Sequence, residues 1–478
     1  MPISDFLQTV IRIFIQAVMP AAACMAVGLV VWCLIYRKRH PGEKIPLRRV
    51  IPFALFLAYL GGLVTITLLI RTTGSSAIQW HLFYAFWDAW NHFDVHFWTL
   101  YLGNIAMFLP LGVFLPLMVR PFRRWYVTIP AGFCLSLLIE AVQYLFQLGS
   151  ADVDDLFCNT VGVIVGYCLC MAVLSLAEKK PGRGAAYGVV PLLSAVALAG
   201  VFIVYYAQPY GNLADGPAFV VDTGRVEWVA HCDLSEEARE VEIFRTEPFD
   251  HDGCLAFARA FVEKQGKTIE EIYNYDDSVL LRDPYGGEGF SMTVSLASRF
   301  YTYSDHAVDA FDATQRDDGQ MTQEQLRAML LEYEIRLPDG AVMTYDGGDD
   351  PYRKGWYTFT ADQILEGYTL LDGTVRCLVS ARGEIGEIEY NLSAGISRAV
   401  ETILSEAEAY EKLCQGKFAY GDVFQFLVET KQLSEVHVLS CELDYILDTK
   451  GFRQPVYHFE LEGLDPVFVP ALRERIGL

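Results

Sequence analysis

The 478-residue sequence carries 37 Lys and Arg against 59 Asp and Glu, and its mean hydropathy of +0.25 is unusual for a soluble protein. Residues 1–206 contain 14 basic and 9 acidic side chains, a net charge of +5, which leaves a net charge of −27 for residues 207–478. Such an acidic surface excludes nucleic acid as a partner, because phosphates bind basic groups.

Six segments are apolar over about 20 residues, the length that a helix rising 1.5 Å per residue needs to cross a hydrocarbon layer of about 30 Å. They cover residues 13–36, 50–70, 97–119, 125–148, 156–177 and 185–206. The first segment is too long for a cleaved secretory signal and lacks its basic start, so we interpret it as an uncleaved anchor. The sequence predicts an all-α transmembrane bundle of six spans over residues 1–206.

The basic residues predict the orientation of these spans, because cytoplasmic loops are enriched in Lys and Arg. They gather after the first, third and fifth spans: Arg37, Lys38, Arg39, Lys44, Arg48, Arg49, Arg120, Arg123, Arg124, Lys179, Lys180 and Arg183. The opposite loops carry Asp88, Asp94, Asp152, Asp154 and Asp155 with a single Arg71. We expect a multi-pass membrane protein whose N-terminus and residues 207–478 both lie outside.

Polar residues occur in the third, fourth and fifth predicted spans, and by depth they fall in one layer. At 1.5 Å per residue, four of them lie within roughly 4 to 12 Å of the outer boundary: Asn104, Glu140, Gln143 and Asn159. An ionisable group in a span costs about 2.5–3.5 kcal/mol and usually faces a bundle interior or a wet cavity. The depth pattern therefore indicates a shared polar site.

The spacing of these residues is helical. Glu140 and Gln143 are three residues apart, and Asp152, Asp155 and Asn159 follow steps of three and four, so each set occupies one helix face. We predict an outward-facing polar binding pocket lined by Arg71, Asn104, Glu140, Gln143, Asp152, Asp155 and Asn159. The alternative is a purely structural role, since Asn and Gln join membrane helices and an Arg–Glu pair can do the same.

Five short motifs follow one another across these spans: Asn104, Phe108-Leu-Pro-Leu-Gly112, Glu140-Ala-Val-Gln143, Asp152-Val-Asp-Asp155 and Asn159-Thr-Val-Gly162. This series resembles the VanZ-like family of bacterial membrane proteins over about residues 51–177. The family takes its name from a member linked to low-level resistance to glycopeptide antibiotics of the teicoplanin type. The resemblance implies a role in the bacterial cell envelope and a place in the cytoplasmic membrane.

Metal sites are weakly indicated. His92 and His96 are spaced i,i+4, as zinc ligands on one helix can be, but the surrounding aromatic loop is more simply an interfacial belt. The stretch 312–325 does not fit a calcium loop, because its first and third ligand positions hold Thr314 and Arg316. The eleven cysteines include no CxxC pair, and both free thiols and disulfides remain open after residue 206. We expect no bound metal or cofactor.

Residues 207–478 show short alternating strands with isolated helices, which predicts an α+β domain, largely antiparallel, with two subdomains as one option. Helices are expected over 252–264, and after Thr322 and Ser405, which have capping-box spacing to Gln325 and Glu408. Strands are expected over 376–380, 387–392, 436–447, 456–461 and 467–469. Residues 405–413, 454–460 and 468–471 resemble extracytoplasmic regulatory modules of the YycH/YycI and PepSY-like kind, and this resemblance implies binding or regulation rather than catalysis.

Three functions compete. The first is recognition of an envelope lipid or peptidoglycan-precursor headgroup by the pocket, with Glu140 and Asp155 as acidic groups and a link to glycopeptide tolerance. The second is regulation of a protein partner through residues 207–478. The third is metal-assisted hydrolysis of a lipid-linked phosphate by the paired carboxylates, so the sequence leaves open whether the chain is an enzyme.

Overall fold

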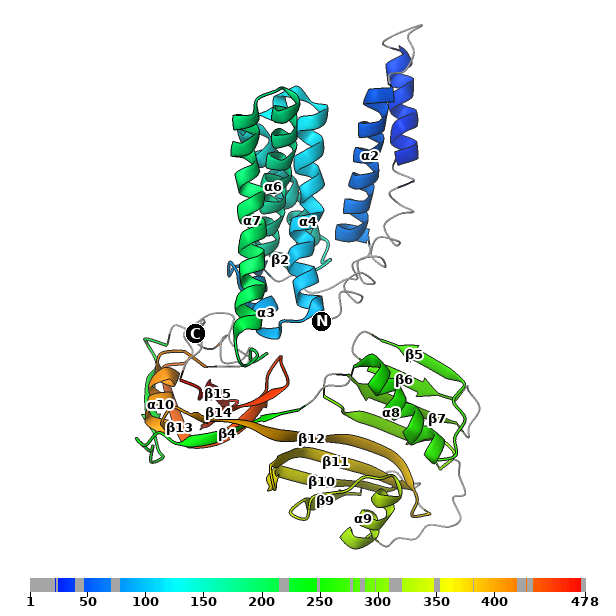
Figure 1. The fold of residues 1–478 in the computed structure, drawn as a ribbon, viewed down its shortest axis with the longest axis vertical. Helices are drawn as coiled ribbons and strands as arrows, with labels where there is room; N and C mark the ends of the chain where they lie inside the picture. Colours follow the sequence, from blue (N-terminus) through cyan, green and yellow to red (C-terminus); the bar gives the residue numbers. More distant parts are fainter. Residues whose placement is uncertain are drawn as a thin grey trace. The chain divides into compact units, whose positions relative to one another are not determined.

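The computed structural model describes residues 22, 25–38, 47–69, 78–214, 223–246, 250–275, 278–283, 289–296, 298–308, 320–347, 353–380, 382–418, 427 and 433–473. The chain divides into two compact units, Met1–Phe219 and Val220–Leu478 (Figure 1). The boundary expected between residues 206 and 207 stays a prediction.

Five long helices dominate the first unit, and each is apolar enough to cross a membrane. They are α2 (Leu47–Val64) with its continuation η1 (Thr65–Leu69), α4 (Val95–Met118), α5 (Trp125–Leu145), α6 (Val153–Ala177) and α7 (Pro181–Ala207). Five of the six expected spans are thus confirmed as apolar helices. The remaining one, over 13–36, lies largely outside the described residues, although 25–38 are helical.

Short elements join these helices: β1 (Ile78–Gln79), α3 (Tyr84–His92), η2 (Arg120–Arg123) and β2 (Ala151–Asp152). Strands β1 and β2 pair in parallel, with Gln79 opposite Asp152. Helix α3 ends at His92, its C-cap residue Phe93 has a left-handed backbone (φ 41°), and α4 begins at Val95. His92 and His96 therefore belong to different helices, so the i,i+4 geometry considered for zinc does not occur.

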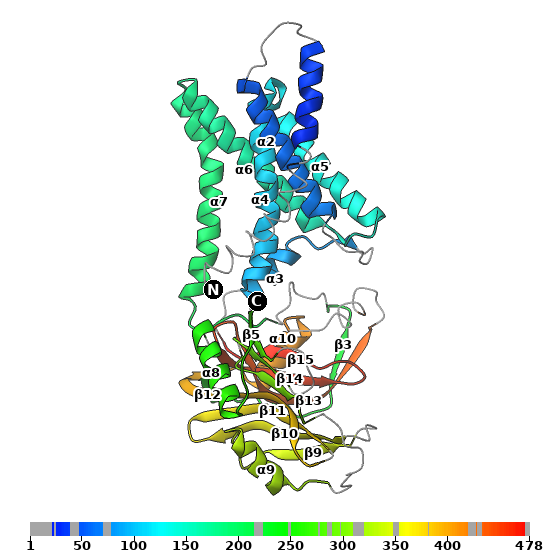
Figure 2. The same cartoon turned by 90° about the vertical axis from the view of Figure 1, so that its right-hand side faces the viewer.

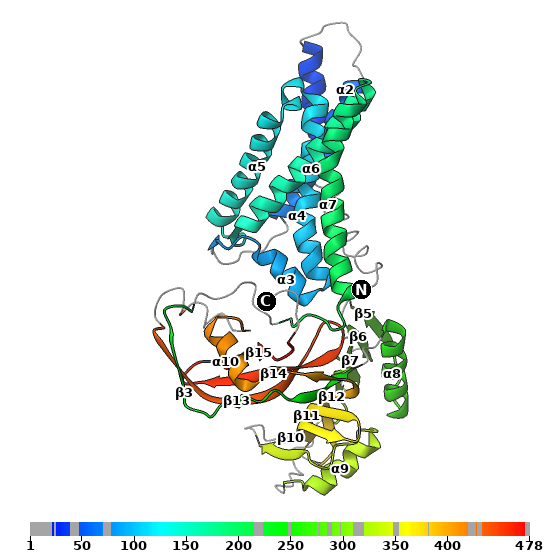
Figure 3. The same cartoon turned by 60° about the vertical axis from the view of Figure 1, so that its left-hand side comes forward.

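Glycines bring α4 and α6 into direct backbone contact. A Cβ atom on Gly112 would lie 2.3 Å from the carbonyl oxygen of Val163, and one on Gly162 would lie 2.2 Å from that of Ile105. Gly162 and Gly166 are four residues apart, the small-residue spacing that lets membrane helices approach closely. Figures 1 and 3 show α4, α6 and α7 side by side, and Figure 2 shows α2 beside α4, where the Tyr59 hydroxyl donates to Met107 O at 2.9 Å.

In its described residues the second unit is a largely antiparallel sheet accompanied by helices, as the sequence predicts. Its helices are α8 (His251–Lys264), α9 (Gln323–Glu332) and α10 (Glu406–Cys414). Its strands are β3 (Glu227–Ala230), β4 (Glu240–Arg245), β5 (Glu271–Asn274), β6 (Ser278–Arg282), β7 (Phe290–Ser295), β8 (Tyr301–Asp305), β9 (Val342–Asp346), β10 (Arg353–Glu366), β11 (Thr369–Ser380), β12 (Ile385–Thr402), β13 (Glu435–Leu447), β14 (Phe452–Leu461) and β15 (Val467–Pro470). Both expected capping boxes form, at Thr322 with Gln325 and at Ser405 with Glu408.

Strand β12 connects the parts of this sheet. It pairs with β11 along one edge, and along the other with β8 over Glu387–Tyr390 and with β4 over Ile396–Thr402. The order β3-β13-β14-β4-β12-β8-β7-β6-β5 follows, with β9, β10 and β11 stacked edge to edge on the other side of β12. The pairs are antiparallel except β3 with β13, which run parallel.

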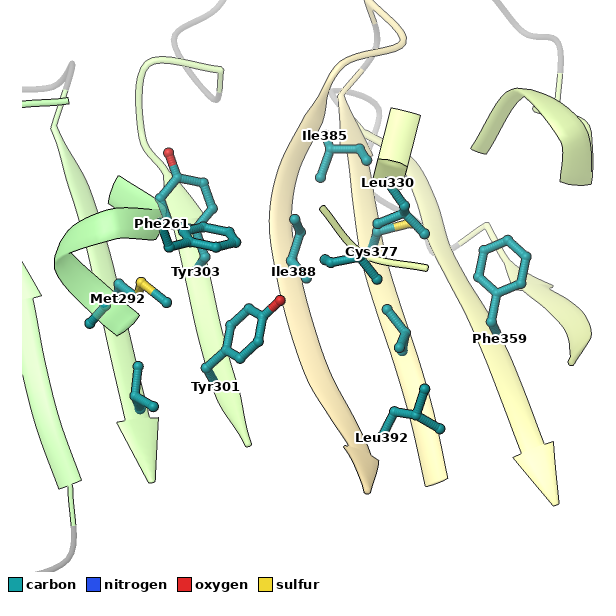
Figure 4. Close-up of a cluster of buried hydrophobic side chains, with 14 of the residues drawn as sticks. Phe261, Met292, Tyr301, Tyr303, Leu330, Phe359, Cys377, Ile385, Ile388 and Leu392 are labelled. Atoms are coloured by element: carbon teal, nitrogen blue, oxygen red, sulfur yellow. The ribbon is translucent and has the colours of Figure 1, made fainter. Parts of the chain in front are cut away.

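Helices α8 and α9 cover the apolar face of this sheet. Figure 4 shows Phe261 of α8 and Leu330 of α9 among strand side chains such as Tyr303, Cys377 and Ile388. Cys377 and Ile388 are fully buried. The unit therefore has its own hydrophobic core.

Candidate functional site

One face of α5 is polar and turned toward the rest of the bundle. Its buried residues recur in steps of three and four: Thr128, Gly132, Ser136, Ile139, Glu140 and Gln143. The remaining surface of α5 is largely apolar and exposed, for example at Leu138 and Leu145. In a membrane this helix would turn its apolar side to lipid and its polar stripe to neighbouring helices.

The polar stripe of α5 bonds directly to α6. Asn159 Nδ2 donates to Ser136 Oγ at 2.9 Å, and both side chains are buried. One helical turn nearer the α5–α6 connection, Glu140 and Asp155 follow on these two antiparallel helices. Glu140 Oε2 accepts a hydrogen bond from the Asp152 backbone N–H at 3.1 Å. The contact between the two helices therefore sets both carboxyl groups at the same level of the bundle.

Helix α4 adds an amide to this level, because Asn104 Nδ2 donates to Asp155 Oδ1. Both side chains are short, so this contact requires that the two backbones lie close together. The glycine contacts between α4 and α6 supply that closeness: a Cβ atom on Gly166 would lie only 2.0 Å from Leu109 O. Backbone packing thus positions the polar contact.

The end of α2 contributes a backbone carbonyl. Gln143 Nε2 donates to Thr67 O at 2.9 Å, and Thr67 lies in the π-helical turn η1. A π turn displaces the backbone from the regular helical ladder and is frequent at functional sites. Thr67 also anchors itself by donating from Oγ1 to Leu63 O at 2.8 Å. The α2 end is thereby tied to the polar stripe of α5.

Two aspartates close the end of α6. Asp152 is its N-cap and accepts from Asp154 N–H at 2.8 Å; burial raises the pKa of Asp152, although this hydrogen bond opposes the shift. Asp154 is 1% exposed, and its carboxylate accepts from the backbone N–H groups of Phe83 and Ala85 at the start of α3. Asp154 therefore holds α3 in place, whereas Asp152 lies beside Glu140.

Within the described residues of the first unit, two buried amide oxygens have no hydrogen-bond partner. They are Gln143 Oε1 and Asn159 Oδ1, on residues that are 1% and 3% exposed. Buried polar atoms are bonded in the great majority of cases, so each exception calls for a bound group or a water. Both oxygens belong to side chains whose nitrogen already bonds to the protein.

Apart from Arg71, the expected pocket residues contact one another or neighbouring elements. We use the name polar cluster for Asn104, Ser136, Glu140, Gln143, Asp152, Asp155 and Asn159. Arg71 lies outside the described residues. The binding role of the cluster stays a prediction.

Sequence reasoning did not single out Ser136, Thr67 or Asp154 as site residues. Ser136 has a detectable signal, because it precedes Glu140 by four residues and shares its helix face. Thr67 has none, since a π turn leaves no mark on hydrophobic periodicity. Asp154 stands inside the Asp152–Asp155 motif, but only the folded chain distinguishes its role from those of its neighbours.

Metal ligands do not gather in the described part of the chain. No group of three or more His, Cys, Asp or Glu side chains there is placed to hold a metal ion. His92 is instead engaged locally, with its Nδ1 atom 3.2 Å from Asp88 Oδ1 and its ring stacked on Phe97 at 4.0 Å. Asp88 lies outside the spans, and burial raises its pKa while His92 opposes that shift.

Residues 53–175 match the model of a family described as VanZ/LLP1. The matched range runs from α2 to α6 and contains every residue of the polar cluster. A comparison with curated proteins finds no match.

Proposed function

Because residues 53–175 form a VanZ-like region, we propose that this membrane protein binds the headgroup of a bacterial envelope lipid or peptidoglycan precursor in its polar cluster. The proposal places it in the cytoplasmic membrane, with the N-terminus and residues 207–478 outside. The supporting observation is that polar side chains from three apolar helices and a carbonyl from a fourth meet within about two helical turns along α5.

The free-energy cost of placing carboxyl groups inside a membrane span favours a functional role for the polar cluster. A carboxyl group inside a span costs about 2.5–3.5 kcal/mol on insertion scales, whereas apolar residues of similar volume would join the same helices without that cost. The cluster has two carboxyl groups, Glu140 and Asp155, at one level of adjacent helices. A bundle that needed only structural contacts would gain nothing from this pair.

Each residue has a proposed role. Glu140 and Asp155 are the acidic groups that face the headgroup, and Asn104, Gln143 and Asn159 form its hydrogen-bonding walls. Asp152 lies at the end of the site nearest the α5–α6 connection. Arg71, the single basic residue of the expected outer loops, is proposed as the contact for a headgroup phosphate.

Lipid co-purification tests the proposal. The wild-type protein and a Glu140→Gln, Asp155→Asn double variant would be purified in the same detergent, and their bound lipids identified by mass spectrometry. The double variant keeps hydrogen-bonding atoms of similar size at both positions but removes both charges. We expect one lipid class to be retained by the wild type and depleted by the variant; identical lipid profiles would refute headgroup binding.

A matched control is available on α6. Thr160 is next to Asn159, but its hydroxyl donates within its own helix, to Leu156 O at 2.7 Å. Thr160→Val changes a hydroxyl to a methyl group at the same depth without touching the polar cluster, so it should retain the wild-type lipid profile. Teicoplanin susceptibility of strains with wild-type or double-variant protein would test the link to glycopeptide tolerance separately.

A second function is favoured by the independent core of the unit Val220–Leu478. Such a unit can bind a protein partner by itself, with the helices serving as an anchor. Fusing it to an unrelated membrane anchor should then preserve function in full. If the fused unit is folded but function is lost, the second proposal is refuted and the function is assigned to the polar cluster.

A further inference from the structure

The second unit contains five cysteines, and the fold separates them into two groups. Cys254 and Cys377 are fully buried in the hydrophobic core beneath α8 and α9. The other three are partly buried and belong to the half of the sheet that carries α10: Cys232, Cys414 and Cys441. Strand register decides which of these three can pair.

Cys441 lies on the face of β13 that α10 covers, and Figures 1 and 3 show α10 beside β13 and β14. Beyond a bulge in β13, Cys441 is opposite Phe459 of β14, and the Phe459 ring lies 6.5 Å from that of Tyr410 on α10, measured between centroids. Before the bulge, Val438 is opposite Leu461. Because Leu461 and Phe459 are two residues apart, they share a face, and so do Val438 and Cys441.

Cys232 continues this face from the neighbouring strand. Strand β3 pairs in parallel with β13, with Ala230 opposite Val438, and the backbone N–H of His231 donates to Val438 O at 2.9 Å. Cys232 is two residues beyond Ala230, and Cys441 is the next residue of β13 on the same face beyond Val438. The two cysteines therefore follow the Ala230–Val438 pair on adjacent strands.

The segment after Cys232 runs to the first turn of α10. Ala407 N–H donates to Ser235 O at 3.1 Å, and Ser235 N–H donates to Glu406 Oε2 at 3.0 Å. Cys414 ends α10, eight residues after Glu406, which is about 12 Å along the helix at 1.5 Å per residue. Cys232 is thus held between β13 and the opposite end of α10 from Cys414.

We propose that Cys232 and Cys441 are joined by a disulfide in the folded protein. Neighbouring strands lie about 4.8 Å apart, and a disulfide joins residues whose Cα atoms are about 4.4–6.8 Å apart. Two cysteines that follow each other on one face of adjacent strands are therefore within reach. The inference rests on the proposed placement of the second unit outside, because disulfides persist in oxidising compartments.

The structure holds both groups as thiols, so the bridge requires an oxidant. Its formation breaks two S–H bonds and makes one S–S bond. The two electrons and two protons pass to a protein or small-molecule disulfide, which becomes a pair of thiols. Cys414 then remains the free thiol of the three.

The surroundings favour a bridge that stays closed once formed. Burial raises the pKa of Cys441 to about 12, with contributions from the charges of Glu406 and Cys232, and burial also raises the pKa of Cys232. A thiol with a high pKa is a poor leaving group, so a disulfide between these two exchanges slowly. The bridge would fasten β3 to β13, with which alone it pairs among the described strands.

Peptide mass spectrometry without prior reduction tests the bridge. Full-length protein would be taken from cells directly into denaturant with N-ethylmaleimide, which blocks free thiols, and then digested. We expect one linked pair of peptides, containing Cys232 and Cys441. Maleimide should be found on the remaining three: Cys254, Cys377 and Cys414.

Thermal unfolding measures what the bridge does, with the β-sheet signal in circular dichroism reporting on the second unit. Reductant should lower the melting temperature of the wild type by about 5–10 °C, the shift expected from loss of one disulfide. Cys232→Ser and Cys441→Ser should melt lower than the wild type and no longer respond to reductant. The matched control Cys414→Ser should respond as the wild type does. If a serine variant does not fold, the peptide map of the wild type still decides the question.

A link through Cys414, or maleimide on both Cys232 and Cys441, overturns the inference. Oxidised glutathione added to the purified, folded protein then identifies the cause. If it joins Cys232 to Cys441, the two are close but their compartment is reducing, and the proposed outside placement fails as well. If it does not, the two sulfur atoms lie apart, and the proposed placement and headgroup binding are unaffected.

Discussion

The glycine contact between α4 and α6 gives a prediction whose size follows from the structure. In Gly166→Ala, the added Cβ atom would lie 2.0 Å from Leu109 O and 2.9 Å from Leu109 C, where ordinary van der Waals contact begins at 3.4 Å. Both atoms belong to helix backbone, so no side-chain rotation relieves the clash. The two helices must separate by about 1 Å or more, because packed interiors have no space to absorb an extra methyl group.

The expected cost is about 2 kcal/mol. Overpacking costs about 1–3 kcal/mol, and separation of the helices weakens the Asn104–Asp155 hydrogen bond, worth about 1 kcal/mol or more. Alanine is favoured over glycine in a helix by about 1 kcal/mol, which offsets part of this. Gly103 is the matched control, because a Cβ atom there meets nothing within 4 Å. Gly103→Ala should be neutral or more stable than the wild type.

Thermal unfolding in detergent, followed by tryptophan fluorescence and by size-exclusion chromatography after heating, measures both variants. Gly166→Ala should melt below the wild type and Gly103→Ala at or above it, and Gly166→Ala should also retain less of the lipid found with the wild type. The reasoning is refuted if the two alanine variants melt at the same temperature, since helix propensity alone would then explain both.

Four further predictions concern single residues. Asn104→Leu removes the donor to Asp155 and should lower stability by about 1–3 kcal/mol in the same thermal assay. Burial raises the pKa of Cys377 to about 12, so iodoacetamide at pH 8 should label this thiol only after denaturation, as peptide mass spectrometry would show. Ser405→Ala should cost the second unit about 1 kcal/mol through loss of its cap, measured by denaturant unfolding. The hydrogen bond at Ser405 lowers the pKa of Glu408 below 4.5, so its contribution to stability is full above pH 4.5 and lost as pH falls through the lowered pKa; Glu408→Gln should remove that part of the pH dependence.

The membrane part of the fold was largely predictable, because long apolar runs have few alternatives. Its irregular features were not. Nothing in the residues Thr65–Leu69 distinguishes a π turn from a continued α-helix, so the carbonyl that receives Gln143 was missed. The four-residue spacing of Gly162 and Gly166 was visible in the sequence, but a glycine pair does not name the helix it contacts.

In the second unit, too, some features were predictable from the sequence and others were not. Its capped helices and C-terminal strands follow local signals and were predicted. Strand β12 was expected over 387–392, yet it extends over Ile385–Thr402. The extension begins with small residues from Ser393 to Gly395, whose alternation is weak, and it is stabilised by pairing with β4, a strand about 150 residues earlier in the chain. Pairing between strands so far apart in the sequence depends on the whole fold and is not encoded by the local residues.

The glycines and the polar cluster of α6 depend on one another. Asp155, Asn159, Gly162 and Gly166 recur in steps of four, three and four, so all four lie on one helix face. Short polar side chains at one end of that face reach across only because glycines at the other end let the backbones meet. A longer side chain should then compensate for a wider gap. In the Gly166→Ala background, Asn104→Gln extends the amide by one methylene and should restore part of the stability and lipid retention, whereas in the wild-type background the same change should lower both. Equal effects of Asn104→Gln in the two backgrounds would show that helix spacing does not control the site.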